Sequence, residues 1–174
     1  MGSMEGQIVE YKDDFNTCKE TFVTFRIIHE ALNPEEITGK FQLAPSDSWR
    51  KGEPKEWKGR AARTGMWVLS TENRVLSRDL RRHLDWIIEH VQDKSLVLDD
   101  LRTQGYHIDV FCHWVQLGGT GGPILSPRNM EGMSRLSLEI SFEFWSEPET
   151  DDEEESAGDD ENECTDQEGS SDRA

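Results

Sequence analysis

Apolar and polar residues follow two different rhythms between residues 21 and 144, one typical of strands and one typical of helices. Strand-like segments are rich in β-branched and aromatic residues, or place an apolar residue at every second position. Helix-like segments repeat apolar residues three and four positions apart. The pattern predicts strands over 21–29, 41–45, 65–70, 107–116 and 136–144, and helices over 33–39, 77–91, 93–105 and 126–135.

The order of these elements indicates an α+β fold of two layers. Helices separate the strands, and the segment 136–144 alternates apolar and polar residues without interruption. Such alternation is typical of a strand with one face buried and one face in water, as in antiparallel sheets. We therefore expect a two-layer sandwich in which helices cover one face of a mixed or antiparallel sheet of four or five strands. A ferredoxin-like arrangement is the candidate topology.

Local signals mark several helix ends and faces. Asn33 and Ser126 each precede a proline, which suits an N-cap followed by the first helical position. In the long helix the apolar stripe is expected to face the sheet and Asp85 to face water, and in the next helix Leu96 is expected to point inward. Gly105 suits the position just after a helix C-terminus.

The negative charge is concentrated near the C-terminus. The 174 residues have a formal charge of -17, but residues 147–174 hold 14 of the 36 acids and one of the 19 bases. This leaves 22 acids and 18 bases in residues 1–146, which are almost balanced. We expect a single α+β domain over 20–146, a tag remnant and loose lead-in over 1–19, and a disordered acidic tail over 147–174.

Cysteine spacing and hydropathy indicate the cellular compartment of the protein. Cys18, Cys112 and Cys164 lie far apart, which fits a reducing compartment better than a disulfide framework. The apolar segments are no longer than strands, and the N-terminal residues lack the apolar core of a signal peptide. The sequence therefore predicts a cytoplasmic protein that does not enter a membrane.

The strand 107–116 is the first candidate site because it contains two histidines, an aspartate and a cysteine. Alternation places Asp109 and His113 on one face, about 13 Å apart and too far for a hydrogen bond, and Cys112 on the other face. Zinc needs three or four converging ligands, whereas this strand offers one or two. We expect no metal, no cofactor and no catalytic residue here, and a Cys112 side chain in the core. His113, next to the glycines, remains a candidate ligand contact.

The glycine-rich loop Gly118–Gly122 is the second candidate. Glycines let backbone N–H groups approach an anion, and a helix that starts at Ser126 would add the positive end of its dipole. The loop has neither the lysine of a phosphate-binding loop nor the dinucleotide fingerprint. A flexible connection is the alternative interpretation. The candidate ligand contacts are Gly119, Gly121 and Gly122.

The third candidate is the polar segment Ser46–Arg63, which has no periodicity and is expected to be a long loop. From Trp49 to Arg63 it holds six bases and two acids, interleaved with two tryptophans. Single-stranded nucleic acid or an acidic protein segment would bind such a surface. Alternatively, Trp49 packs on the core and the lysines are merely solvated. The candidate ligand contacts on this side are Trp49, Arg50, Lys51 and, from the next strand, Trp67.

Several short motifs occur in the order found in a known family. They are Leu32–Thr38 (LNPEEIT), Ala44–Pro45, Ser48–Gly52 (SWRKG), Gly65–Ser70 (GMWVLS) and His83–Trp86 (HLDW). Together with the predicted strand 136–144, these motifs resemble the bacterial family of domains of unknown function DUF4279, over about residues 20–146. The resemblance implies a small stand-alone bacterial domain of the cytosol. It implies no activity and no catalytic residues, and it does not account for the acidic tail.

These features favour a non-enzymatic protein-binding module. A compact body, strong acidity and the lack of a catalytic signature suit an inhibitor or immunity-type protein with a basic protein partner. The first alternative is a binder of a small anion or nucleotide that brings Arg50, Lys51 and His113 to the glycine loop. The second is a nucleic-acid mimic that acts through the acidic tail. Nucleic acid itself is not the expected partner, and the sequence predicts no oligomeric state.

Overall fold

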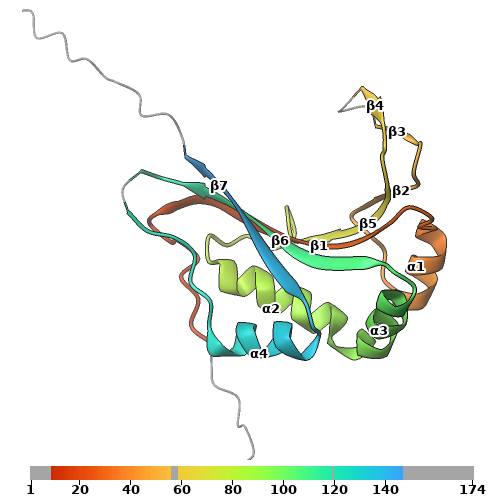
Figure 1. Ribbon diagram of the computed structural model, residues 1–174. Helices are drawn as coiled ribbons and strands as arrows, with labels where there is room; N and C mark the ends of the chain where they lie inside the picture. The colour runs from red at the N-terminus through yellow and green to blue at the C-terminus, as the bar shows by residue number, and fades with distance from the viewer. Residues whose placement is uncertain (1–8, 56–58, 119, 147–174) are drawn as a thin grey trace, which may run out of the picture.

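The structure, a computed structural model, describes residues 9–55, 59–118 and 120–146 (Figure 1). The predicted tag remnant and the predicted disordered tail over 147–174 lie outside the described residues, as does Gly119.

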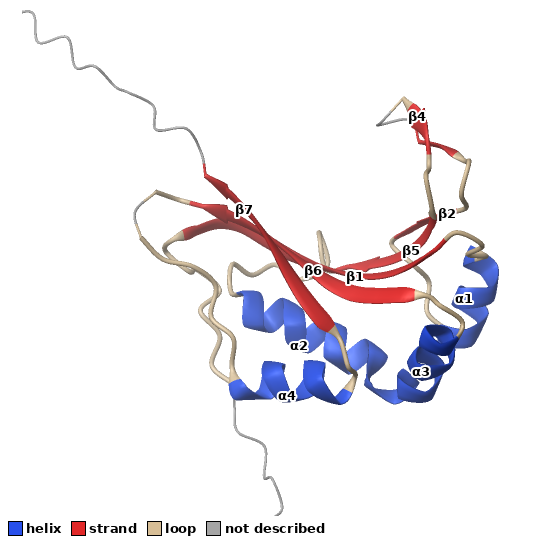
Figure 2. Ribbon diagram, in the orientation of Figure 1, coloured by secondary structure: helices blue, strands red, loops and turns tan. Residues whose placement is uncertain are grey.

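Five strands form one sheet, and the helices lie against one of its faces (Figure 2). The order across the sheet is β2-β5-β1-β6-β7. The strands are β1 (Cys18–His29), β2 (Asp47–Trp49), β5 (Gly65–Ser70), β6 (His107–Gln116) and β7 (Glu139–Ser146). The predicted two-layer α+β sandwich with a mixed sheet is confirmed.

The helical layer consists of four α-helices and one short 3-10 turn among the described residues. They are α1 (Pro34–Phe41), α2 (Leu80–Val91), η1 (Gln92–Lys94), α3 (Ser95–Thr103) and α4 (Pro127–Arg135). The side chains of Asn33 and Ser126 accept hydrogen bonds from the first turns of α1 and α4, so both predicted N-caps are confirmed. The N-cap of α2 is Asp79 rather than Ser77.

Strand directions explain the topology. β1 and β2 are both antiparallel to β5, which lies between them, so β1-α1-β2 is a split βαβ unit. β6 then pairs antiparallel with the other edge of β1, which completes a ferredoxin-like order. β7 adds a fifth strand beyond β6 and runs parallel to it. The expectation of an antiparallel last strand was wrong because the connection through α4 returns the chain to the same end of the sheet.

The core lies between the sheet and the helices. Residues at alternate positions of the central strands are fully buried on this side, and helix residues meet them. The largest are Phe25, Trp67 and Trp114 from strands, and Phe41, Leu84 and Leu98 from helices. Each contributes about 1.5–3 kcal/mol through burial. Cys112 is buried among them, as expected from its face of the strand.

Two expected segments around residues 41–63 differ in the structure. Phe41 is the last residue of α1, and Gln42 follows it with a left-handed φ of 54°, so no strand occurs over 41–45. The polar segment 46–63 contains β2 and a two-stranded ribbon made of β3 (Pro54–Lys55) and β4 (Arg60–Ala61). The ribbon projects beyond the edge of the sheet (Figure 1). Its short strands bury no apolar stripe, so no periodicity marks them in the sequence.

Two side chains point in directions opposite to those expected. Leu96 is 83% exposed because α3 presents Leu98 to the core, and two residues along a helix turn the side chain by about 200°. Asp85 is buried, because α4 and the N-terminal segment both pack on that side of α2. Its carboxylate accepts hydrogen bonds from Asn129 Nδ2 (2.8 Å) and from Tyr11 (2.7 Å).

The described part of the N-terminal lead-in differs from the loose segment expected. Tyr11 bonds to Asp85, and the Lys12 amide donates to the carboxylate of Asp79, the N-cap of α2 (2.8 Å). The Arg78 amide donates to the Asp13 carbonyl at 3.0 Å. These contacts tie residues 11–13 to the start of α2.

Candidate binding surface

The face of the sheet opposite the helices carries no described helix (Figure 2), and we call it the open face. Strand alternation assigns side chains to it, because their neighbours along each strand are buried on the helix side. Its apolar and aromatic side chains are Phe22, Ile28, Trp49, Met66, Val68, Phe111, Val115 and Trp145. They come from all five strands, so the surface is built by the complete sheet.

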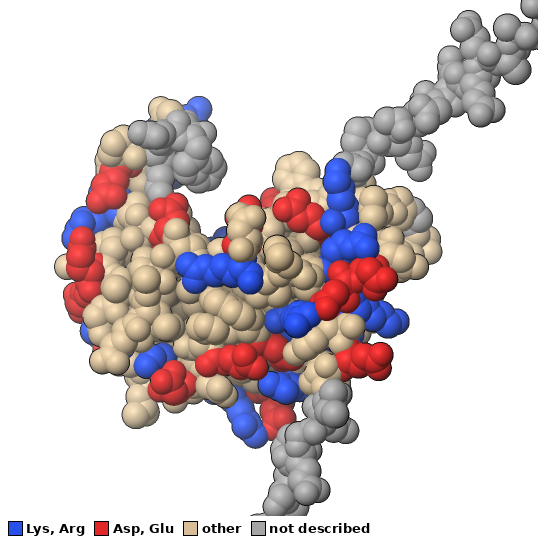
Figure 3. Space-filling view, turned by 180° about the vertical axis from the view of Figure 1, so that it is seen from behind, with Lys and Arg blue, Asp and Glu red and all other residues tan. Residues whose placement is uncertain are grey.

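The open face is concave. The sheet bends toward the open side at the β3–β4 ribbon and again at the far ends of β1, β6 and β7 (Figure 1). The space-filling view shows a hollow between these two raised ends (Figure 3). A concave surface lets a partner contact several strands at once.

An ion pair occupies the centre of the open face. Arg26 on β1 donates from Nε to Asp109 Oδ1 (2.8 Å) and from Nη2 to Oδ2 (2.5 Å). The Asp109 side chain is only 8% exposed, and the Arg26 guanidinium also lies 4.5 Å from the ring centroid of Phe111. A bidentate, largely desolvated pair fixes the geometry of both side chains. His107 Nε2 lies 3.3 Å from the same carboxylate.

A second cluster lies toward the other end of the face. The rings of Phe22 and His113 stack with centroids 4.6 Å apart. His113 Nδ1 is 3.5 Å from Glu143 Oε2 on β7. His113 is therefore held between an aromatic ring and a carboxylate rather than directed toward the glycine loop.

The structure does not bring the predicted ligand contacts of the three candidate segments together. Strand β1 lies between Trp49 and His113 and gives a common reference. Trp49 lies opposite Met66, which lies opposite Ile28 of β1, whereas His113 lies opposite Phe22 of β1. Six residues along a strand correspond to about 20 Å. The small-anion alternative required these two ends of the sheet to converge on the glycine loop.

The predicted bases are engaged with acids of the same chain. Arg50 donates to Asn33 Oδ1 at 2.9 Å and also binds the Glu35 carboxylate. Lys51 Nζ lies 2.9 Å from Glu30. Both bases thus connect the end of β2 to the turn and helix that follow β1.

Of the remaining predicted contacts in the described residues, Trp67 and Gly121 have structural roles. Trp67 is fully buried, and its indole N–H donates to Thr38 Oγ1 at 3.0 Å. Gly121 has a φ of 154°, and a Cβ there would lie 3.0 Å from Thr17 Oγ1, so glycine permits close packing on the N-terminal segment. At Gly122 a Cβ would meet nothing within 4 Å.

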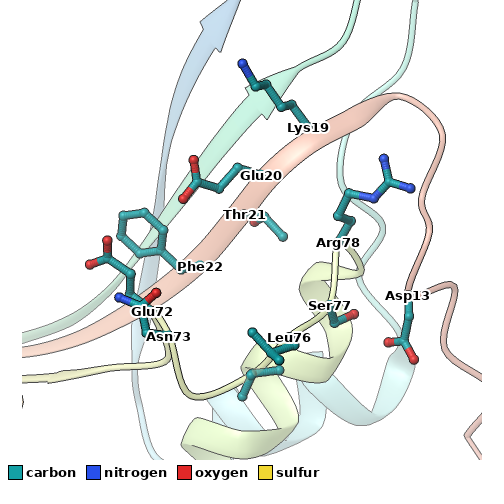
Figure 4. A pocket seen from close by; sticks show the side chains of 11 residues that line it. Asp13, Lys19, Glu20, Thr21, Phe22, Glu72, Asn73, Leu76, Ser77 and Arg78 are labelled. Carbon is teal, nitrogen blue, oxygen red and sulfur yellow. The ribbon is translucent and has the colours of Figure 1, made fainter.

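A pocket of about 320 Å³ borders the open face (Figure 4). It lies beside Lys19 and Phe22, where β1 extends past the end of β5, because pairing with β5 begins only at Thr24. The segment Glu72–Arg78 forms its other wall, and Leu76 there is 89% exposed. Both acids and bases line this pocket, which therefore indicates no particular charge of ligand.

The described residues offer little for covalent or metal chemistry. Burial raises the pKa of Cys18 to about 11 and that of Cys112 to about 12, so both thiols stay protonated near neutral pH. No three His, Cys, Asp or Glu side chains of the described residues form a grouping that could hold a metal ion. Within the same ranges, no helix has the length and apolar content needed to cross a membrane.

Sequence reasoning missed the centre of the open face. Arg26 is the one charged residue within the apolar run 21–28. A charged residue in such a run indicates a charge that is partly buried and paired. Its partners could not be named, because the register between β1 and β6 decides that Asp109 and Phe111 lie beside it.

The fold and this surface define a two-layer α+β domain with an uncovered, aromatic sheet face. A family model described as "Domain of unknown function (DUF4279)" matches residues 17–147, and the chain therefore belongs to that family. The match includes every strand and helix of the structure, and the resemblance indicated by the short motifs is confirmed. No curated protein and no solved structure matches the chain.

Proposed function

We propose that the protein is a non-enzymatic binding module that holds a basic protein partner on its open face, as an inhibitor or immunity-type protein does. The observation that carries this proposal is the uncovered concave sheet, with aromatic side chains around the Arg26–Asp109 pair. Aromatic residues, methionine and arginine are enriched at the centres of protein interfaces. Apolar patches of this kind on a soluble domain mark interaction sites.

Charge supports a basic partner. The acids on the open face are Glu20, Asp47, Asp109, Glu139 and Glu143, whereas Arg26 is the base at its centre and Lys19 is a base at its margin (Figure 4). The carboxylate of Asp109 is paired with Arg26 at the centre, and the other four acids lie on the strands around it. Complementary charge of this kind speeds association and selects the partner. Residues 147–174 follow β7 directly and add a formal charge of -13, which extends the attraction.

The experiment is affinity capture of host proteins by the full chain and by two matched variants. Phe111→Ser removes a half-buried ring from the open face, and Leu96→Ser removes an 83% exposed side chain from the helix side. We expect a basic protein to be captured by the wild type and by Leu96→Ser, and to be lost with Phe111→Ser. Circular dichroism and thermal unfolding establish that both variants are folded.

The captured protein is then purified and titrated into each variant by calorimetry at two salt concentrations. We expect Phe111→Ser to raise the Kd at least about tenfold and higher salt to weaken binding. Equal affinity for both variants would refute the open face as the site. A thermal shift with inorganic phosphate or ATP would favour the small-anion alternative, since a ligand at a hundredfold its Kd adds about 2.7 kcal/mol.

A further inference from the structure

The strand β7 forms a long edge of the sheet. Its eight residues pair in an unbroken register with β6, from Asp109–Glu139 to Gln116–Ser146. Its other edge pairs with no described strand, and β7 is the edge of the sheet nearest the viewer in Figure 1. The opposite edge strand, β2, has only three residues and continues into the ribbon. The sheet therefore has one extended edge on which another strand can pair.

This edge lacks most of the features by which monomeric proteins protect an edge strand. Such strands are short, contain proline, lysine or other charged residues, or are interrupted by a bulge, and of these β7 has only the two charges of Glu139 and Glu143. The sequence Glu139–Ser146 (EISFEFWS) has no proline and no lysine, and its register with β6 has no shift. Phe144 and Trp145 are 59% and 54% exposed at its end. A free edge with exposed aromatic residues is suited to pairing with a further strand.

We propose that β7 pairs antiparallel with β7 of a second copy of this chain, about a two-fold axis at Phe142. The two sheets then become one sheet of ten strands, with all helices on the same side. This inference concerns the chain alone and does not rest on the proposed function.

The register follows from which side chains lie opposite one another. In an antiparallel pair, opposite residues point to the same face. With Phe142 opposite itself, Ile140 lies opposite Phe144 of the second copy on the helix side. This places the exposed Phe144 ring against an apolar neighbour. On the open face, Ser141 lies opposite Glu143, and Glu139 lies opposite Trp145.

Other registers are less favourable. An axis at Ser141 would place Glu139 opposite Glu143, and an axis at Glu143 would place that residue opposite itself. Like charges directly opposite each other are destabilising. A shift by one residue would put the apolar side chains of the two copies on opposite faces. Axes further along the strand leave too few residues paired.

The acidic tails make the association depend on salt. The two Ser146 residues lie at opposite ends of the paired strands, about 27 Å apart by strand geometry. At physiological ionic strength the screening length is about 8 Å, so repulsion between the following segments is weak, whereas it is strong at low salt. Dimerisation is therefore expected to strengthen as salt increases, in contrast to partner binding on the open face.

The first test is analytical ultracentrifugation of the full chain over a wide concentration range. Trp145→Lys and Trp145→Glu are a matched pair, because both replace an exposed indole that the dimer places opposite Glu139. We expect the dimer Kd of the glutamate variant to exceed that of the lysine variant about tenfold, since each dimer contains the contact twice. Leu96→Ser should leave the Kd unchanged. A wild-type chain that stays monomeric at every concentration and salt, or equal Kd values for the matched pair, would overturn the inference.

A second test reads the register directly. Glu139→Cys combined with Trp145→Cys, in a chain with Cys164→Ser, should form a disulfide-linked dimer on mild oxidation. Leu96→Cys in the same background should remain monomeric under the same conditions. Absence of the linked dimer from the first protein would refute the axis at Phe142. Because neither test contains a partner protein, failure here leaves the proposed function intact, and failure of partner capture leaves the dimer intact.

Discussion

Arg26 and Asp109 face each other on the neighbouring strands β1 and β6, and two hydrogen bonds join the guanidinium to the carboxylate. The pair lies on the open face, yet the Asp109 side chain is 8% exposed and that of Arg26 is 24% exposed. Phe111 covers one side of the guanidinium. The centre of the candidate surface is thus rigid before any partner arrives, which lowers the entropic cost of binding.

Loss of one member of this pair is expected to be costly. Arg26→Leu leaves the Asp109 carboxylate buried without its main partner, so we expect the free energy of unfolding to fall by about 2–4 kcal/mol. The double variant Arg26→Leu/Asp109→Leu should lose less than Arg26→Leu alone, because no unpaired charge remains. Urea denaturation of wild type, both single variants and the double variant measures this. Strictly additive losses would contradict the coupling of the pair.

Stability is expected to depend on pH through His83. This histidine is buried, with Nδ1 2.6 Å from Thr71 Oγ1 and Nε2 2.9 Å from the Ser77 carbonyl oxygen. Burial lowers the pKa of His83 below its ordinary value of 6.5. The unfolded chain therefore binds a proton that the folded chain does not, and stability falls as pH drops below about 6.5.

The measurement is urea denaturation between pH 5 and pH 8, a range chosen to lie above the ordinary carboxyl pKa values of about 4. His83→Gln is the comparison, because glutamine fits a polar site without titrating. Its stability should change less over this range than that of the wild type. Parallel curves for the two proteins would show that another group is responsible.

Two glycines are expected to respond oppositely to alanine. At Gly65 a Cβ would lie 2.7 Å from Leu32 Cβ and 3.0 Å from the His29 carbonyl oxygen, so Gly65→Ala should destabilise by about 1–3 kcal/mol. At Gly39, inside α1, a Cβ would meet nothing within 4 Å, so Gly39→Ala should stabilise by about 0.5–1 kcal/mol. Thermal unfolding of both variants, compared with the wild type, measures these two changes in stability. A stabilised Gly65→Ala would mean that β1 and β5 separate more readily than this contact implies.

The N-terminal segment is expected to contribute to stability through Tyr11. Its hydroxyl donates to Asp85 at 2.7 Å, and burial together with this bond raises the pKa of Tyr11 to about 12. Tyr11→Phe should cost about 1–2 kcal/mol at neutral pH. Above pH 10 the unfolded tyrosine ionises first, so this contribution is lost as pH rises through 10 to 12. Tyrosinate absorbance of wild type and variant gives the titration, and ionisation of Tyr11 near pH 10 would contradict the contact.

Local signals in the sequence were sufficient for most elements. The predicted strand 107–116 and the predicted helix up to Arg135 have those bounds in the structure, because alternation and N-caps depend on neighbouring residues alone. The ribbon β3–β4 was missed because two-residue strands have no measurable period. The direction of β7 was missed because alternation reports which face is buried and carries no information on the direction of the neighbouring strand.

The amino-acid sequence by itself therefore determined the two-layer class, the family and the core positions of the central strands, since these follow from short-range patterns. The candidate surface was decided by the tertiary structure. The register of β1 against β6 places Arg26 beside Asp109 and Phe111, and the same sheet separates Trp49 from His113 by about 20 Å along the strands. Positions on different strands acquire neighbours only when the sheet forms, because register is a long-range property of the folded chain.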